Sequence, residues 1–241
     1  MISIVILCHN QIESTKRTMN SLLKFYNEVP YRFILFDNGS TDGTFEYLKS
    51  IPYKDTTIIR YEENKGFIEP NNSAMQMSDD DILFLNNDIE VFFDHWLDRL
   101  HEELQFSDVG LTYPLIQTRG QLFYGGIIQN RKESLLNYVN DKPKSIDDNK
   151  KLKIPTWAQF CCALVKRKVI NEIGLLDSLT YKFAYFEDVD YCVRLSEKYK
   201  MKLVEDVIVE HFQSVTAKKV NSDKYRYANR ENFYEKWKGK F

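Results

Sequence analysis

Short apolar runs alternate with amphipathic segments along the N-terminal part of the chain. Four runs have the length and composition of buried strands: Ile2–Cys8, Arg32–Phe36, Thr56–Tyr61 and Ile82–Leu85. A helix is predicted from Glu13 onward, where apolar residues recur at helical spacing, and another around Pro70–Met77, where the proline fits a first turn. Strands that alternate with helices in this way predict a parallel sheet covered by helices.

After the fourth run the pattern becomes less regular. Helices are predicted at His95–Gln105, Arg167–Ile173 and Glu187–Lys200. Strands are predicted at Val109–Leu115, Leu122–Ile128, Thr156–Lys166 and Lys202–Val209. The polar segment Arg131–Lys153 is predicted to be a mobile loop or a surface insertion. The whole pattern predicts the α/β class, with a Rossmann-like mixed sheet flanked by helices.

Composition narrows the class of protein. The 241 residues suffice for one large α/β domain with or without a small appendage, and a net charge of -2 removes the whole-protein argument for a nucleic-acid partner. The apolar start Met1–Cys8 has the character of a first strand rather than of a signal peptide, and no run is long enough to span a membrane. Four cysteines without metal-ligand spacing predict free thiols in a reducing compartment: Cys8, Cys161, Cys162 and Cys192. A cytoplasmic protein is the expectation.

The most informative stretch is Asn86-Asn87-Asp88, directly after the apolar run Ile82–Leu85. In open α/β sheets ligands bind beyond the carboxyl ends of the strands, so Asp88 is aimed at the usual binding crevice. A hard cation that holds a diphosphate would take this oxygen ligand. The alternative is a solvated turn, because Asn and Asp satisfy turn backbone with their own side chains.

The predicted helix that starts at Glu187 carries the second candidate. One face of this helix holds Asp188, Tyr191, Cys192, Leu195 and Tyr199. Asp188 therefore heads an inward-facing stripe, where a carboxylate is placed for proton transfer. An acid that complements the helix dipole is an equally good explanation. Asp190 and Arg194 are four residues apart on another face, and we interpret them as an ordinary helix-surface ion pair.

Two features near the C-terminus have alternative interpretations. His211 follows the last predicted strand; a lone histidine is more often structural, and it becomes a candidate metal ligand only because Asp88 needs partners. The tail Lys218–Phe241 interleaves aromatic with basic residues. Such a tail could contact an anionic membrane or a polyanion, but a terminal helix that docks its aromatic side chains on the body is the preferred interpretation.

Several separate segments resemble one family. They are the runs Phe36–Thr44, Asn64–Phe67 with Asn71-Asn72, Leu85–Asp88, Gly125-Gly126, Tyr185–Asp190, and His211 before Ser214. In this order, and over nearly the whole chain, they resemble a family 2 glycosyltransferase of the GT-A type, similar to the bacterial enzymes that build surface polysaccharides and protein-linked glycans. The resemblance implies a GT-A catalytic domain over residues 1–216, with a nucleotide-binding half to about 90 and an acceptor half after it, and a helical tail over 217–241.

The resemblance also implies roles for individual residues. Asp37 would meet the uracil or thymine edge of a sugar nucleotide, and Asn10, Asn38, Lys65 and Asn87 would lie near the nucleotide. Asp88 and His211 would bind a divalent metal, Mn²⁺ or Mg²⁺. Asp188 would be the catalytic base, in agreement with the helix-face argument. Trp157, Gln159 and Glu187 would lie near the sugar or the acceptor.

These parts imply an inverting transfer of a hexose from a nucleoside-diphosphate sugar to a hydroxyl of a glycan or glycoprotein. UDP-glucose or UDP-galactose is the favoured donor, and dTDP-rhamnose is the next choice. The C-terminal tail could make a peripheral contact with the inner face of the membrane or could mediate oligomer formation. The chain departs from the family pattern at Asn86, where the metal motif usually has Asp, and at Trp157–Cys162, where bulkier groups would narrow the sugar pocket. One alternative is a sugar nucleotidyltransferase, against which Cys8–Ser14 has no glycine for a phosphate loop. The other is a non-catalytic module that only binds a glycan or nucleotide.

Overall fold

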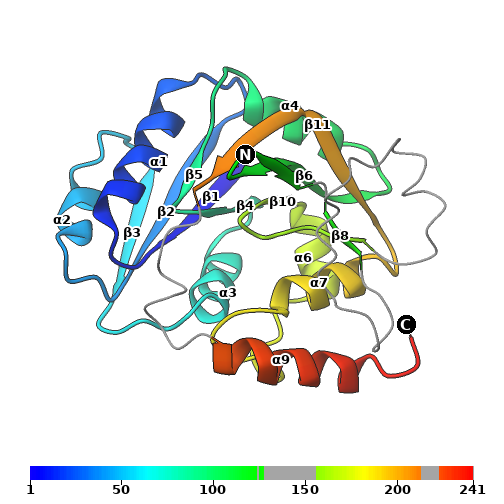
Figure 1. Ribbon diagram of the computed structural model, residues 1–241. Coiled ribbons are helices and arrows are strands. Elements are labelled where there is room, and N and C mark those ends of the chain that lie inside the picture. Colours follow the sequence, from blue (N-terminus) through cyan, green and yellow to red (C-terminus); the bar gives the residue numbers. More distant parts are fainter. Residues whose placement is uncertain (124, 128–155, 213–222, 241) are drawn as a thin grey trace.

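A curled mixed sheet forms the centre of the molecule. The computed structural model describes residues 1–123, 125–127, 156–212 and 223–240. Within them the main sheet has nine strands, in the order β3-β2-β1-β4-β10-β6-β11-β5, with β7 added beside β6, and β8 and β9 form a separate pair (Figure 1). The strands are β1 (Ile2–Cys8), β2 (Tyr31–Asn38), β3 (Thr56–Tyr61), β4 (Asp81–Asn86), β5 (Ile89–Glu90), β6 (Val109–Thr118), β7 (Gln121–Phe123), β8 (Gly126–Ile127), β9 (Thr156–Trp157), β10 (Cys162–Val165) and β11 (Lys200–His211).

The N-terminal half of the sheet is parallel, as the sequence predicts. β1 pairs in parallel with both β2 and β4, and β2 pairs in parallel with β3. β1 is almost completely buried because its neighbours flank it on both edges and helices cover its faces, which explains its continuous apolar run. The four strands therefore present their carboxyl ends at one edge of the sheet.

The C-terminal half supplies the antiparallel members that make the sheet mixed. β10 runs antiparallel between β4 and β6, and β11 runs parallel to β6. β5, at the end of the sheet, pairs antiparallel with β11 and aligns Ile89 with His211. The end of the last long strand is thereby brought beside the residues that follow β4.

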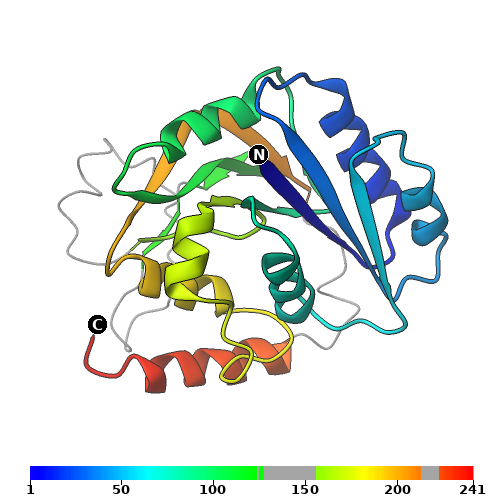
Figure 2. The ribbon, with the colours of Figure 1, turned by 180° about the vertical axis from the view of Figure 1, so that it is seen from behind.

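Helices cover both faces of the sheet. The helices are α1 (Ile12–Lys24), α2 (Thr44–Lys49), α3 (Ile68–Met77), α4 (Trp96–Leu104), α6 (Arg167–Ile173), α7 (Glu187–Leu195) and α9 (Asp223–Lys236). Figures 1 and 2 show α1, α2 and α4 on one side and α3, α6 and α7 on the other, with α9 running along the outside of this second group. No helix among the described residues combines the length and the apolar character that crossing a bilayer requires.

Three predicted elements differ from the structure. The helix predicted to reach Lys200 ends at Leu195, because the chain then turns and β11 already starts at Lys200, whose N–H donates to the Asp108 carbonyl at 2.7 Å. The strand predicted at Thr156–Lys166 is two strands, β9 and β10, separated by a turn at residues 158–161. The strand predicted at Leu122–Ile128 is likewise divided into β7 and β8, with Gly125 at a φ of 117° between them. The segment Arg131–Lys153 and Ser214 lie outside the described residues.

The C-terminal helix docks on the body, as the preferred interpretation of the tail predicts. Phe233 of α9 is completely buried and its ring lies 5.7 Å from that of Phe186. Tyr225 stacks on Phe183 with ring centroids 5.0 Å apart.

All four cysteines are free and buried, which confirms the prediction of free thiols.

Candidate active site

The carboxyl ends of the parallel strands gather the residues expected at the nucleotide. The register aligns Cys8 of β1 with Asp37 of β2, and Leu7 with Asn86 of β4. The side chain of Asp37 is fully buried; it accepts a hydrogen bond from the Ser40 N–H at 3.2 Å, and Arg60 lies 3.5 Å from its other oxygen. Asp37 is thus a buried carboxylate at the edge of the sheet where ligands bind in folds of this kind.

Asn38 shapes the neighbouring loop from within. Its amide donates to the Asn64 side chain at 3.1 Å and to the Gly66 carbonyl at 2.9 Å, and its oxygen accepts from the Lys65 N–H at 2.8 Å. The Lys65 ammonium pairs with Glu63 at 2.7 Å. The side chain of Asn38 therefore holds the loop 64–66 in place. The side chain of Lys65, by contrast, lies at the surface.

Two further asparagines are also engaged inside the chain. Asn10 has a φ of 55° and accepts from the Thr41 N–H at 2.8 Å, which ties the turn after β1 to the turn after β2. Asn87 donates to the Thr15 hydroxyl of α1 at 3.0 Å. Both residues lie at the edge of the sheet where a nucleotide is expected. In this structure their side chains make hydrogen bonds within the protein that fix the conformation of that edge.

Asp88 and His211 meet, although 123 positions separate them in the sequence. The His211 Nε2 atom lies 3.1 Å from a carboxylate oxygen of Asp88, and both side chains are largely buried. The pairing of β5 with β11 brings them together, and the Phe212 N–H donates to the Asp88 carbonyl at 3.0 Å. Burial opposes protonation of His211, but the neighbouring Cys161 and Asp88 outweigh it and raise its pKa to about 10.

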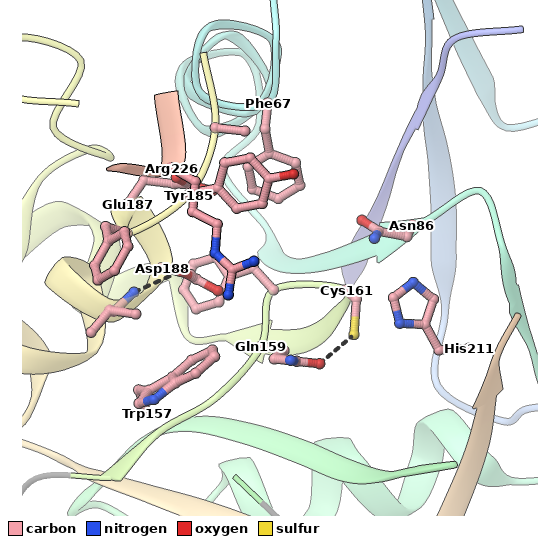
Figure 3. A pocket seen from close by; sticks show the side chains of 14 residues that line it. Phe67, Asn86, Trp157, Gln159, Cys161, Tyr185, Glu187, Asp188, His211 and Arg226 are labelled. Carbon is pink, nitrogen blue, oxygen red and sulfur yellow. Dashed lines mark hydrogen bonds between the residues drawn. The ribbon is translucent and has the colours of Figure 1, made fainter. Parts of the chain in front are cut away.

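A pocket of about 380 Å³ joins this pair to the second candidate acid (Figure 3). Asn86 and His211 line it on one side, and Asp188 and Glu187 line it on the other. Trp157 and Gln159 also contribute to the wall. The residues expected for metal, catalysis and sugar therefore converge on a single pocket, which Asp88 adjoins through His211.

The first turn of α7 carries two adjacent carboxyl groups with different environments. Glu187 is buried, and its Oε2 atom has no hydrogen-bond partner among the described residues. Burial and the neighbouring Asp188 together raise the pKa of Glu187 well above its ordinary value. Burial also raises the pKa of Asp188, to about 6, while a hydrogen bond from the Val189 N–H at 2.8 Å opposes the shift. Of the two acids, Glu187 is therefore the one whose ionisation is opposed both by burial and by a neighbouring carboxylate.

Asp190 corrects one sequence interpretation. Its ion pair with Arg194 is present, at 2.8 Å, but the carboxylate is completely buried and does not lie on the helix surface. Trp237 Nε1 donates to it at 2.9 Å, the Tyr181 hydroxyl at 3.1 Å, and the Lys236 ammonium lies 2.7 Å away. Helical spacing alone could not show this, because the tail that covers Asp190 is distant in the sequence.

The pocket also contains residues that the sequence argument did not single out. Phe67 and Tyr185 supply aromatic walls, Cys161 lies between Gln159 and His211, and Arg226 of α9 reaches in from the tail (Figure 3). The mixture of aromatic and basic residues in the tail drew attention to the segment that contains Arg226. Nothing in that pattern distinguished a residue that lines the pocket from one on the surface. Rings with polar partners suit the apolar faces and hydroxyl groups of a sugar.

The fold and the pocket define the class: this is the GT-A fold of glycosyltransferases. A structure of GalNAc-T7 with UDP, GalNAc and Mn²⁺ matches with a TM-score of 0.70 and 19% identity, over 88% of this chain and 44% of that chain. The mannosyltransferase PcManGT from Pyrobaculum calidifontis, in complex with GDP-Man and Mn²⁺, matches with a TM-score of 0.64 and 13% identity, over 90% of this chain and 58% of that chain. At these identities the likeness shows the fold alone.

The sequence pattern of glycosyl transferase family 2 matches residues 3–174, and the chain belongs to this family. Glycosyltransferase AglE of Haloferax volcanii is 27% identical over 56% of this chain and 47% of its own length. The uncharacterized glycosyltransferase YfnE of Bacillus subtilis is 25% identical over 87% of this chain and 64% of its own. The O-antigen biosynthesis protein RfbC of Myxococcus xanthus is 28% identical over 53% of this chain and 10% of its own. This chain thus spans less than two thirds of each relative.

Proposed function

We propose that the protein is an inverting glycosyltransferase that moves a hexose from a nucleoside-diphosphate sugar to a hydroxyl group of a glycan or glycoprotein. The observation that carries the proposal is the pocket that Asp188 shares with His211, the partner of Asp88. A base and a cation site on opposite walls of one pocket leave room between them for the anomeric carbon of a donor sugar. The family membership supports the reaction class.

Asp88 and His211 would hold a divalent cation, Mn²⁺ or Mg²⁺. Their carboxylate and imidazole, 3.1 Å apart, are ligand types that these metals accept, provided that His211 gives up the proton that its raised pKa retains. Among the residues that the structure describes, no group of three or more His, Cys, Asp or Glu side chains has an arrangement that could hold a metal ion. A site with two protein ligands fits a cation that takes its remaining ligands from water and a diphosphate. When bound, the metal would neutralise charge on the departing diphosphate.

Asp188 would act as the general base. Its carboxylate takes the proton of the acceptor hydroxyl while the hydroxyl oxygen forms a bond to the anomeric carbon. The bond from that carbon to the diphosphate breaks, and its electron pair leaves with the phosphate oxygen. A pKa of about 6 keeps Asp188 ionised at neutral pH yet close enough to neutrality for efficient proton transfer. Turnover should therefore fall as the pH drops through about 6.

The donor is expected to be UDP-linked, with glucose or galactose favoured and dTDP-rhamnose behind. Asp37 would accept from the N–H of the uracil or thymine base. A UDP complex among the structural neighbours supports this choice, whereas a GDP-mannose complex among them shows that the fold also serves other donors. Trp157, Gln159 and Glu187 would contact the sugar or the acceptor. A cytoplasmic location, with or without contact to the inner face of the membrane, remains a prediction from the sequence.

A panel of sugar nucleotides, each incubated with the protein and Mn²⁺, tests the proposal by release of nucleoside diphosphate. One donor should be hydrolysed well above the others, and Asp188→Asn should reduce acceptor-dependent transfer by ~10²–10⁴-fold while UDP binding persists. The anomeric configuration of the product, measured by NMR, should be opposite to that of the donor. Retention of configuration would remove the inverting mechanism.

The two alternatives predict different results in the same assays. A sugar nucleotidyltransferase would release pyrophosphate from a nucleoside triphosphate and a sugar phosphate. A non-catalytic module would bind UDP or a glycan in calorimetry and release no product from any donor. Either outcome would replace the proposed reaction.

A further inference from the structure

The loop that leads into the acid pair has an unusual backbone. Phe183, Tyr185 and Phe186 have φ values of 66°, 79° and 71°, in the left-handed region. Residues that carry bulky side chains rarely adopt this region, because the side chain meets the backbone. Three such residues lie within the four positions before Glu187. The loop therefore needs contacts with other parts of the protein to keep this backbone conformation.

Asn229 of α9 supplies much of that support. This side chain is 1% exposed and makes four hydrogen bonds to the loop. Its amide donates to the carbonyls of Lys182 at 2.9 Å, Ala184 at 2.8 Å and Tyr185 at 3.1 Å, and its oxygen accepts from the Lys182 N–H at 3.1 Å. A side-chain amide thus replaces the backbone partners that an irregular loop lacks.

The opposite side of the loop rests on the segment that follows β3. The N–H of Phe67 donates to the Phe183 carbonyl at 2.6 Å. A Cβ atom on Gly66 would lie only 2.4 Å from the same carbonyl oxygen, so only glycine fits there. Asn38, at the end of β2, holds Gly66 in turn at 2.9 Å. The loop is therefore fixed between the nucleotide edge of the sheet and the C-terminal helix.

The helix that carries Asn229 also faces the pocket. Arg226, Asn229, Phe233 and Trp237 follow one another at i, i+3, i+7 and i+11, which places them on one side of the helix axis. Of these, Arg226 lines the pocket and Phe233 is completely buried. Asn229 thus lies between the pocket and the hydrophobic contact that docks the helix.

We propose that Asn229 is a positioning residue: it holds the loop 182–186 in the strained shape that presents Asp188 to the acceptor. This inference rests on the proposed role of Asp188 as the base. It makes the C-terminal helix part of the catalytic machinery, since α9 determines the shape of the loop from which the acid pair projects. The loop would otherwise relax to ordinary backbone angles and carry Asp188 away from its working position.

The test compares Asn229→Asp with Asn232→Asp. Both changes are isosteric, add one negative charge and lie on the same helix. Asn232 donates a single hydrogen bond, to the Thr180 carbonyl at 2.9 Å, from an exposed position. N229D should lower kcat by ~10–100-fold, because the lost amide leaves three carbonyl groups facing a carboxylate, whereas the KM for the donor should change little. N232D should resemble the natural protein in both constants.

Amide hydrogen exchange supplies a readout that does not depend on activity. The Phe67 amide, which bonds to the loop, should exchange ~10-fold faster or more in N229D, and amides of β1 should not change. Asn229→Ala, which removes all four bonds, should also accelerate exchange at the Lys182 amide. N232D should leave all these amides at their original rates.

The outcomes separate the two proposals. If D188N abolishes transfer and N229D keeps normal kcat and exchange rates, the positioning role is wrong and the proposed function stands. If D188N keeps transfer, the assignment of Asp188 as the base is wrong while glycosyl transfer itself stands, and the positioning inference fails even when exchange at Phe67 accelerates. Loss of the global fold in both N229D and N229A would also overturn the inference, because Asn229 would then support the whole domain rather than this loop.

Discussion

Replacing Asp188 with Asn should make the protein more stable at neutral pH while it removes transfer activity. Burial raises the pKa of this carboxyl from 3.8 to about 6, so the folded protein binds the proton more tightly than the unfolded chain. Between pH 4 and pH 6, roughly, the folded state therefore holds the extra proton, and the free energy of unfolding falls as the pH rises. Above the folded pKa the natural protein carries the full penalty of a buried charge. An amide carries none.

The size of the effect follows from the shift. A difference of about two pKa units corresponds to ~3 kcal/mol at 1.36 kcal/mol per unit, and partial exposure of Asp188 to the pocket makes this an upper figure. Urea unfolding at pH 8 should show a gain of ~2–3 kcal/mol for D188N, equivalent to ~4–12 °C in Tm for a chain of this size. The gain in the free energy of unfolding should disappear near pH 4, where residue 188 is uncharged in the folded natural protein as well as in the folded variant. The hydrogen bond from the Val189 N–H can persist, because Asn keeps an acceptor oxygen.

Asp79→Asn is a suitable control, since Asp79 is exposed and lies outside the pocket. This variant, which removes a carboxylate at an exposed position, should stay within ~0.5 kcal/mol of the natural protein in urea unfolding at pH 8. Equal stability of D188N and the natural protein at both pH 4 and pH 8 would refute the argument that the site buries a charge at Asp188. A gain of the same size at both pH values would assign the effect to packing instead.

Three further predictions concern other parts of the structure. Asp88→Asn should abolish the Mn²⁺-dependent part of UDP binding in calorimetry and leave the metal-independent part, and EDTA should act on the natural protein in the same way. Asp190→Ala should cost ~1–3 kcal/mol in urea unfolding, because it removes the completely buried acceptor shared by Tyr181, Trp237 and Arg194; Asp206→Ala, at an exposed ion pair, should cost under ~1 kcal/mol. Gly126→Ala should lower the thermal midpoint and donor turnover together, since a Cβ there would lie 1.8 Å from Trp157 Nε1 and must displace the pocket wall; an unchanged midpoint would contradict this contact.

The parallel half of the fold was predictable because its central strands β1 and β4 consist mainly of apolar residues. Ile2–Cys8 and Ile82–Leu85 are buried on both faces, and composition alone reports that environment. The segment Thr156–Lys166 was predicted wrongly as one strand, because the turn between β9 and β10 consists mainly of apolar residues, of which Phe160 and Cys161 line the pocket. Hydrophobicity does not distinguish a residue that packs in a strand from one that forms a ligand pocket.

The candidate site was predictable where a residue follows a strand or heads a helix. Asp37 lies at the end of β2, Asp88 follows β4 and Asp188 lies in the first turn of α7, which are places that the strand and helix patterns identify. Asp190 was misread because its burial comes from Trp237 and Lys236, which no local pattern connects to it. Long-range packing of the tail was the part that a single sequence could not supply.

The meeting of Asp88 and His211 depends on a ladder of only two residue pairs, at the very margin of the sheet. Such a short terminal ladder is the first part of a sheet to fray, so the two proposed cation ligands can separate while the core of the domain stays intact. If Asp88 and His211 hold a cation, its binding would stabilise this pairing of β5 with β11. Binding of metal and nucleotide would then reduce backbone motion at residues 88–90 and 210–212. The last strand pair of the sheet would become ordered in the same step in which the ligands bind.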